Sequence, residues 1–224
     1  MQYLIANWKA NKNLEEIHDW FETFLTLLEQ DEKVTHALES QEIHIIICPS
    51  FPFLLTVKEL TKNTGLSVGA QDISVKAPGK YTGEVPAVLI SNIAEYTIIG
   101  HSERRSYFGE TEEIIKEKIA LATSNDITSI SCLRNSEDIV PQNATIIAYE
   151  PVSAIGSGQN EEPALVMEMK RRLNLGTEQS FLYGGSVTRD NISAYAQTGE
   201  ISGYLVGTAS LDATHFFELA RAIL

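Results

Sequence analysis

The pattern of the chain predicts an α/β fold, a single closed (β/α)8 barrel. Short β-branched runs recur along the sequence, and most segments between them have apolar residues at helical spacing. Strands that alternate with helices imply right-handed βαβ units and a parallel sheet that is buried on both faces. Eight such units favour a closed barrel over an open doubly wound sheet, which remains the alternative.

The elements follow in chain order. The predicted strands are residues 3–7, 43–49, 66–70, 96–100, 127–132, 145–150, 180–185 and 204–207. Helical spacing is clearest at Leu14, Ile17, Phe21, Leu25 and Leu28, and at Ile114, Ile115, Ile119 and Leu121. The stretch 161–173 predicts an amphipathic helix with Leu165, Met169 and Leu173 on its packed face. No Pro-, Gly- or Ser-rich linker divides the chain, so we expect one domain over residues 1–224.

Composition excludes several classes of partner. The 224 residues carry a formal net charge of −13, which repels nucleic acid and anionic membranes. The apolar run before Asn7 is too short for a secretory signal or a membrane span, so we expect neither. Cys48 and Cys132 each end an apolar run, which favours a reducing cytoplasm over a disulfide framework. The remaining histidines show no metal spacing and are interpreted as non-catalytic; they are His18, His36, His44 and His215.

Polar residues and glycines follow the predicted strands at the positions where a barrel builds its active face. They are Asn7 and Lys9 after the first strand, His101 and Glu103 after the fourth, Glu150 after the sixth, Gly184, Gly185 and Ser186 after the seventh, and Gly207 after the eighth. An unpaired carboxylate at the end of a buried strand is costly, which suggests that Glu150 has a function. The set suits proton transfer on an anionic substrate.

Five motifs resemble those of the triosephosphate isomerase family in order and approximate spacing. They are NWKAN (7–11), IIGHSERR (98–105), AYEPVSAIGSG (148–158), YGGSV (183–187) and LVGTASL (205–211). The resemblance runs from residue 3 to the C-terminus and implies that dihydroxyacetone phosphate and glyceraldehyde 3-phosphate are interconverted through an enediolate without a cofactor. Another phosphate-binding barrel isomerase, such as one of amino-acid biosynthesis, would not need GHSER and AYEP together.

The resemblance also implies catalytic roles. Glu150 matches the base that takes a proton from carbon, and His101 matches the imidazole that acts on the carbonyl oxygens. His101 would open a helix near Ser102, whose positive end would lower the pKa of the ring, as is known for this family, and keep it neutral. Lys9 would supply positive charge and Asn7 a neutral donor, while Glu103 would support the lysine.

Phosphate binding and a lid are implied in the same way. The residues expected to offer backbone N–H groups to the phosphate are Gly156, Ser186, Gly207 and Thr208. The expected lid loop is Pro151, Val152, Ser153, Ala154, Ile155, Gly156, Ser157 and Gly158. Its closure would bury Glu150 between Ile155 and Leu205 and make the carboxylate more basic. Backbone groups need no surplus of basic side chains, so the negative net charge is no obstacle.

The loop at residues 71–86 is long and aperiodic, with two glycines and two prolines. Such a loop is usually functional or bound to a partner. In the resembled family the equivalent loop inserts into a second subunit, where the threonine that matches Thr82 reaches toward the neighbouring site. We therefore expect a homodimer, with a mobile surface loop as the alternative.

Three departures from the family pattern stand out. Cys132 and Glu150 are 18 positions apart (150 − 132), and the interval contains Pro141, so one outer helix is expected to be shortened or absent. The family's CIGE reads CLRN here, and its hinge tryptophan is Ser153. Thr208 replaces a glycine and would resist a left-handed backbone, which would weaken phosphate binding. The alternative function is therefore a catalytically weakened barrel that binds a small phosphorylated ligand.

Overall fold

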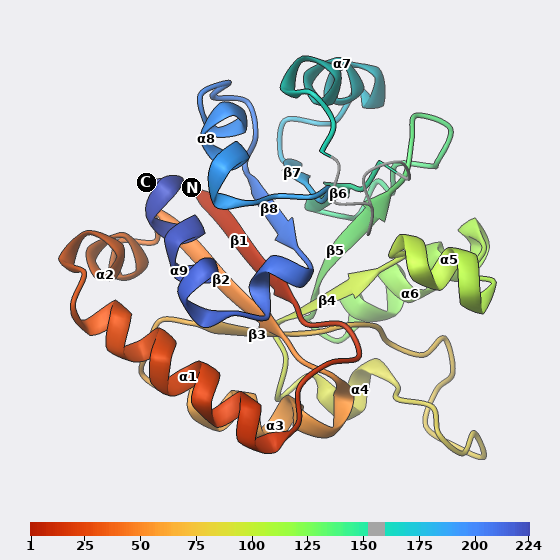
Figure 1. The fold of residues 1–224 in the computed structure, drawn as a ribbon. Helices are drawn as coiled ribbons and strands as arrows, with labels where there is room; N and C mark the ends of the chain where they lie inside the picture. The colour runs from red at the N-terminus through yellow and green to blue at the C-terminus, as the bar shows by residue number, and fades with distance from the viewer. Residues whose placement is uncertain (152–159) are drawn as a thin grey trace.

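The predicted closed barrel is confirmed in a computed structural model, which describes residues 1–151 and 160–224 (Figure 1). Eight parallel strands pair in chain order, and β8 pairs with β1 to close the sheet, which excludes the open alternative. The strands are β1 (Gln2–Asn7), β2 (Ile43–Cys48), β3 (Ser67–Ala70), β4 (Tyr96–Ile99), β5 (Thr128–Leu133), β6 (Ile146–Tyr149), β7 (Ser180–Tyr183) and β8 (Gly203–Val206). Each lies within two residues of its predicted bounds.

Helices surround the barrel (Figure 1). They are α1 (Leu14–Glu29), α2 (Glu32–Glu39), α3 (Leu54–Leu60), α4 (Ala87–Ile90), α5 (Ser102–Phe108), α6 (Glu112–Ser124), α7 (Pro163–Leu173), α8 (Arg189–Ala196) and α9 (Ala213–Ala222), with short 3-10 turns at η1 (Phe51–Phe53) and η2 (Thr208–Ser210). The prediction that Leu165 lies on the packed face of α7 is wrong, because this residue is 51% exposed. The buried stripe runs through Val166 and Leu173, which lie two turns apart, so Leu165 falls at its margin.

The core has two layers, as the alternation of side chains along a strand requires. On β1, Tyr3 and Ile5 belong to the cluster that fills the barrel interior, whereas Leu4 and Ala6 pack outward against the helices. Cys48 and Cys132 are buried free thiols. Among the described residues, no helix combines the length and the apolar content that crossing a bilayer requires. The interior layer packs inside the sheet. The candidate functional side chains lie at the carboxyl ends of the strands that enclose it.

One outer helix is absent, as the sequence predicts. β5 and β6 are joined by residues 134–145, all of which are described and none of which is helical (Figure 1, green). A cavity of about 570 Å³ lies between α6 and this loop and is lined by Ile115, Ile119, Ile139 and Val140 among others. Ile139 is 64% exposed there. The loop thus exposes an apolar side chain of its own, while Ile115 and Ile119 on α6 remain buried at 2% each.

Asp138 accepts hydrogen bonds within the short loop between β5 and β6, and it also contacts α5, the helix that follows β4. Its carboxylate accepts hydrogen bonds from the backbone N–H of Arg134 at 2.7 Å and from its guanidinium. Burial raises the pKa of Asp138, but the Arg134 contacts outweigh burial and hold it below its usual range. Asp138 also lies 3.9 Å from buried Arg105, whose Nε donates to the carbonyl of Gly100 at 2.8 Å. The loop is thus linked to the residue that precedes His101.

Candidate active site

The carboxyl end of β1 supplies Asn7 and Lys9. Asn7 is buried, and its Oδ1 accepts a hydrogen bond from the backbone N–H of Lys9 at 3.1 Å. Lys9 has a φ of 52°, which lies in the left-handed region that residues other than glycine rarely adopt. Such a conformation persists only where neighbouring groups hold it, and it is common at functional sites.

Side chains from the next two loops hold this backbone in place. Ser50 Oγ donates to the carbonyl of Lys9 at 3.0 Å, and Gln71 Nε2 donates to the same oxygen at 2.8 Å and to the carbonyl of Cys48 at 2.9 Å. The ammonium of Lys9 lies 2.5 Å from Glu103 Oε1. Lys9 is therefore fixed at both its backbone and its charged end.

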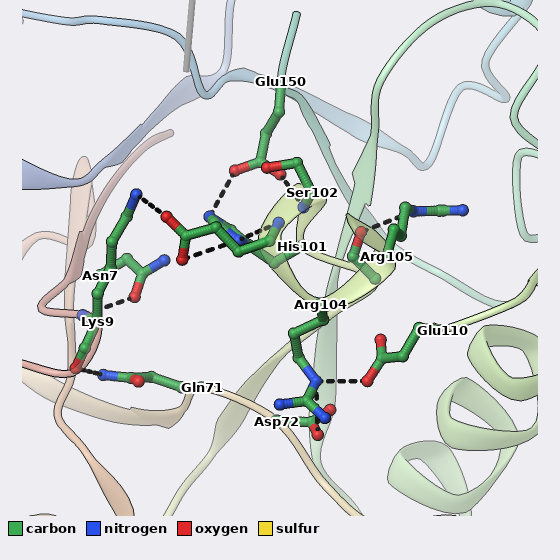
Figure 2. A network of polar contacts seen from close by, with 12 residues as sticks. Asn7, Lys9, Gln71, Asp72, His101, Ser102, Arg104, Arg105, Glu110 and Glu150 are labelled. Carbon is green, nitrogen blue, oxygen red and sulfur yellow. Dashed lines mark hydrogen bonds and ion pairs between the residues drawn. The ribbon is translucent and has the colours of Figure 1, made fainter. Parts of the chain in front are cut away.

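His101 caps the N-terminus of α5 and contacts Glu150 across the barrel mouth (Figure 2). Its Nδ1 accepts the backbone N–H of Glu103 at 3.2 Å, and its Nε2 lies 3.0 Å from Glu150 Oε1. The other carboxylate oxygen of Glu150 accepts the backbone N–H of Ser102 at 3.1 Å. Because Nδ1 accepts a hydrogen bond, the ring proton is assigned to Nε2, which donates to Glu150.

The contact between His101 and Glu150 changes both pKa values. Burial favours the neutral imidazole, but the adjacent Glu150 carboxylate outweighs burial and raises the pKa of His101. The lowered pKa expected from the helix N-terminus is therefore wrong for this arrangement. Burial likewise raises the pKa of Glu150, but His101 and the Ser102 N–H outweigh it and hold that pKa below its usual range.

A cavity of about 470 Å³ lies at the carboxyl ends of the strands. Its lining residues are Asn7, Lys9, His101, Glu150, Gly184, Gly185, Ser186, Val187, Thr188, Leu205, Gly207, Thr208, Ala209 and His215. Lys9 is the one lysine or arginine among the lining residues that the structure describes. The cavity therefore brings together residues from β1, β4 and β6 that are far apart in the sequence.

The predicted phosphate and lid residues divide into two groups. Ser186, Gly207 and Thr208 line the cavity, whereas Gly156 and the rest of the predicted lid at positions 152–158 lie outside the described residues. Pro151 is described and buried. Thr208 opens the 3-10 turn η2 and is not among the residues with positive φ. The concern that threonine would resist a left-handed backbone at this position therefore does not apply.

Two of the other predicted residues lie at the edge of the site or outside it. Glu103 pairs with Lys9 but is absent from the described lining of the cavity. Thr82 is exposed in the loop at residues 71–86 and does not contribute to the cavity either. Conversely, His215 lines the cavity although the sequence analysis interpreted it as non-catalytic. Among the described residues, no group of histidine, cysteine, aspartate and glutamate has the arrangement of a metal site.

Gly184 is required by close packing against the catalytic candidate. A Cβ at this position would lie 2.8 Å from Cγ of Glu150 and 3.3 Å from the carbonyl of Tyr149. Two carbon atoms that are not bonded to each other do not approach as closely as 2.8 Å. Any side chain at position 184 therefore has to displace the carboxylate of Glu150. A glycine after β7 thus sets the position of Glu150.

The variant Gly184→Ala should therefore lower kcat by about 10- to 100-fold, because a shift of roughly 1 Å in a reacting group costs up to that factor. Steady-state kinetics checks this result. Gly176→Ala is the matched control, since a Cβ there meets only Gln179 Oε1 at 3.7 Å and the substitution should leave kcat unchanged. Equal kcat values for the two variants would contradict the positioning role of Gly184.

Comparison with known proteins agrees with this geometry. The family model for triosephosphate isomerase matches residues 2–145 and 137–223. The chain is 34% identical over 248 residues to the triosephosphate isomerase of Aquifex aeolicus, with 96% of this chain and 97% of that protein covered. It is 34% identical over 250 residues to the Thermus thermophilus enzyme, with 96% of each covered, and 33% over 244 residues to that of Bacteroides fragilis, with 94% of each covered. The chain therefore belongs to the triosephosphate isomerase family.

Proposed function

We propose that this protein interconverts dihydroxyacetone phosphate and D-glyceraldehyde 3-phosphate by proton transfer through an enediolate, as a step of glycolysis and gluconeogenesis and without a cofactor. One observation supports this function best: Lys9, His101 and Glu150 line a single cavity of about 470 Å³. An ammonium, an imidazole and a carboxylate are the groups that proton transfer next to a carbonyl requires. Membership of the family supports the same reaction.

Glu150 is the general base. Its carboxylate contacts His101 and Ser102 and has to leave these partners to reach a substrate carbon. The contacts that lower its pKa are lost in that movement, while burial, which raises the pKa, remains. The carboxylate thus becomes a stronger base when it moves toward the substrate.

His101 is the acid that acts on the substrate oxygens. Its Nε2–H, which points to Glu150, becomes available to a carbonyl oxygen once that carboxylate leaves. The same departure removes the negative charge that raises the pKa of His101, so the neutral ring is favoured during the reaction. The backbone N–H of Glu103 holds Nδ1 as an acceptor and keeps the remaining proton on Nε2.

The other residues stabilise charge and hold the substrate. Lys9 stabilises the enediolate oxygens, with Asn7 as a neutral donor beside it and Glu103 as the partner that orients the ammonium. One preorganised donor of this kind is worth roughly 3–4 kcal/mol of the barrier. Backbone groups of Gly156, Ser186, Gly207 and Thr208 bind the phosphate, and closure of the lid at residues 151–158 excludes water.

A coupled assay with glyceraldehyde 3-phosphate tests the reaction. The expected result is conversion to dihydroxyacetone phosphate and, in D2O, deuterium on the carbon next to the carbonyl, because the enediolate exchanges its proton through Glu150. The reaction is excluded if conversion does not exceed that of a protein-free blank. Binding of 2-phosphoglycolate without conversion would identify the weakened barrel instead.

We further propose that residues 1–224 form one cytoplasmic domain that dimerises through the loop at residues 71–86. In Figure 1 the middle of this loop (yellow) extends away from the barrel between β3 and α4. Tyr81 within it is 49% exposed, and Val88 and Leu89 on α4 are 47% and 60% exposed, as is typical of a surface that binds a partner. At the base of the loop, Asp72 accepts hydrogen bonds from Lys118 at 2.6 and 2.8 Å.

Light scattering on the purified protein should accordingly give twice the chain mass of 24.8 kDa. Replacing Thr82 and Tyr81 with aspartate should shift the population toward the monomer, because two charges would be buried in the contact. Leu165→Asp, on the exposed margin of α7, is the matched control and should leave the dimer intact. A wild-type protein that is purely monomeric would refute the proposed contact.

A further inference from the structure

His215 occupies a position that no strand-end argument predicts. It is the third residue of α9, where its backbone N–H donates to the carboxylate of Asp212 at 2.8 Å. Its side chain is 69% exposed, yet it lines the same cavity as Lys9 and Glu150. It is therefore a solvated imidazole at the mouth of the proposed active site.

The neighbours of His215 lie on the phosphate side of the cavity. Gly207, Thr208 and Ala209 line it between the end of β8 and α9, and Ser186 and Thr188 line it from the loop before α8. These two loops contain Ser186, Gly207 and Thr208, three of the four residues expected to bind phosphate. His101 and Glu150 instead follow β4 and β6 and contact each other.

The cationic side chains that line the cavity differ in whether they already have a bound partner. Among the described lining residues, the lysine, arginine and histidine side chains are Lys9, His101 and His215. Lys9 is bound to Glu103, and His101 is bound to Glu150. None of the described residues donates or accepts a hydrogen bond at the ring of His215, and its nearest acid, Asp212, is 4.0 Å away. The ring is thus available to a ligand.

We propose that His215 is a further substrate-binding residue, which contacts the phosphate group of the triose substrate as a protonated imidazole. This rests on the proposed function. The protein carries a net charge of −13, which opposes the approach of a phosphate dianion. A positive charge at the mouth would add to the attraction that the backbone N–H groups already supply.

The charged groups around His215 determine how strongly its positive charge would change the affinity for an anion. Asp212 Oδ1 lies 4.0 Å from Nδ1 of His215, and Glu218 on α9 is paired with Arg189 at the start of α8 at 3.0 Å. The ammonium of Lys12 is bound to the carbonyl of Leu211 at 2.7 Å, next to Asp212. An exposed charge in such surroundings changes anion affinity by about two- to fivefold.

Calorimetric titration with 2-phosphoglycolate tests the contact at about pH 6 and about pH 8.5, on either side of the ordinary pKa of histidine. His215→Gln should weaken binding by about two- to fivefold at the lower pH and have no effect at the higher pH, because an imidazole adds positive charge to the contact only when it is protonated. His215→Lys keeps its charge and should bind at least as tightly as the wild type at both. His18→Gln, an exposed histidine of α1 away from the cavity, is the control for surface charge.

The outcomes separate this contact from the isomerase assignment. Equal affinity of wild type and His215→Gln at about pH 6 overturns the contact, as does weak binding by His215→Lys at about pH 8.5. A wild-type protein that does not bind 2-phosphoglycolate at all overturns it too. Wild type that binds with the predicted pH dependence but does not convert glyceraldehyde 3-phosphate would keep the contact and remove the proposed reaction.

Discussion

Replacement of Glu150 by glutamine should lower kcat by about 10³- to 10⁴-fold while binding of 2-phosphoglycolate changes little. Glutamine has nearly the same shape, and its amide oxygen can still accept the Ser102 N–H that Glu150 accepts at 3.1 Å. It cannot take a proton from carbon. The loss therefore falls on the chemical step, and a coupled assay at saturating substrate measures it.

The same variant provides a readout that does not depend on turnover. Because the Glu150 carboxylate contributes most to raising the pKa of His101, with a smaller contribution from Glu103, Glu150→Gln should lower that pKa. A titration of the ring nitrogens by NMR should show His101 gaining its proton at a lower pH in the variant than in the wild type. This result would connect the geometry of the pair to its proposed roles.

Glu137→Gln is the matched control for this experiment. Glu137 is exposed on the loop that replaces the missing helix, so the substitution removes one carboxylate without touching the cavity. We expect its kcat and the titration of His101 to match the wild type. A kcat for Glu150→Gln within tenfold of wild type would rule out Glu150 as the base.

The strands and the catalytic candidates were predictable because both follow from local chemistry. β-branched runs formed the buried strands, and Asn7, His101 and Glu150 lie where those strands end. The strand-end argument also applies to Gln71, which follows β3 directly and holds the backbone of Lys9. Gln71 was missed because an amide carries no obvious chemistry, although its two donors suit a positioning role.

Other features depend on contacts between distant residues and could not be read from the chain. The helix N-terminus at Ser102 predicts a lowered pKa for His101, but the Glu150 carboxylate, which arrives from β6, reverses the direction. The backbone conformation at Thr208 is set by the 3-10 turn rather than by the residue type. His215 gave no signal, since it lies on a helix and reaches the cavity only through the packing of α9 against α8 and η2.

Replacement of Lys9 by methionine should lower kcat/KM by about 10²- to 10³-fold, because the site loses its one lysine among the described lining residues. Methionine keeps the unbranched chain that passes close to Gly207, where a Cβ would lie 3.3 Å from Lys9 Cε. Packing is thus retained while the charge is removed. Lys62→Met is the control, because Lys62 forms only an exposed pair with Glu59.

Part of the loss in Lys9→Met should come from Glu103 rather than from the missing ammonium. The Glu103 carboxylate, which lies 2.5 Å from Lys9 Nζ, would remain beside the cavity without its partner and repel an anionic substrate. The double variant Lys9→Met with Glu103→Gln should therefore bind 2-phosphoglycolate several-fold more tightly than Lys9→Met alone, without recovering kcat. If the double variant binds no better, Glu103 acts only by orienting the lysine, and the whole effect belongs to the ammonium at the substrate oxygens.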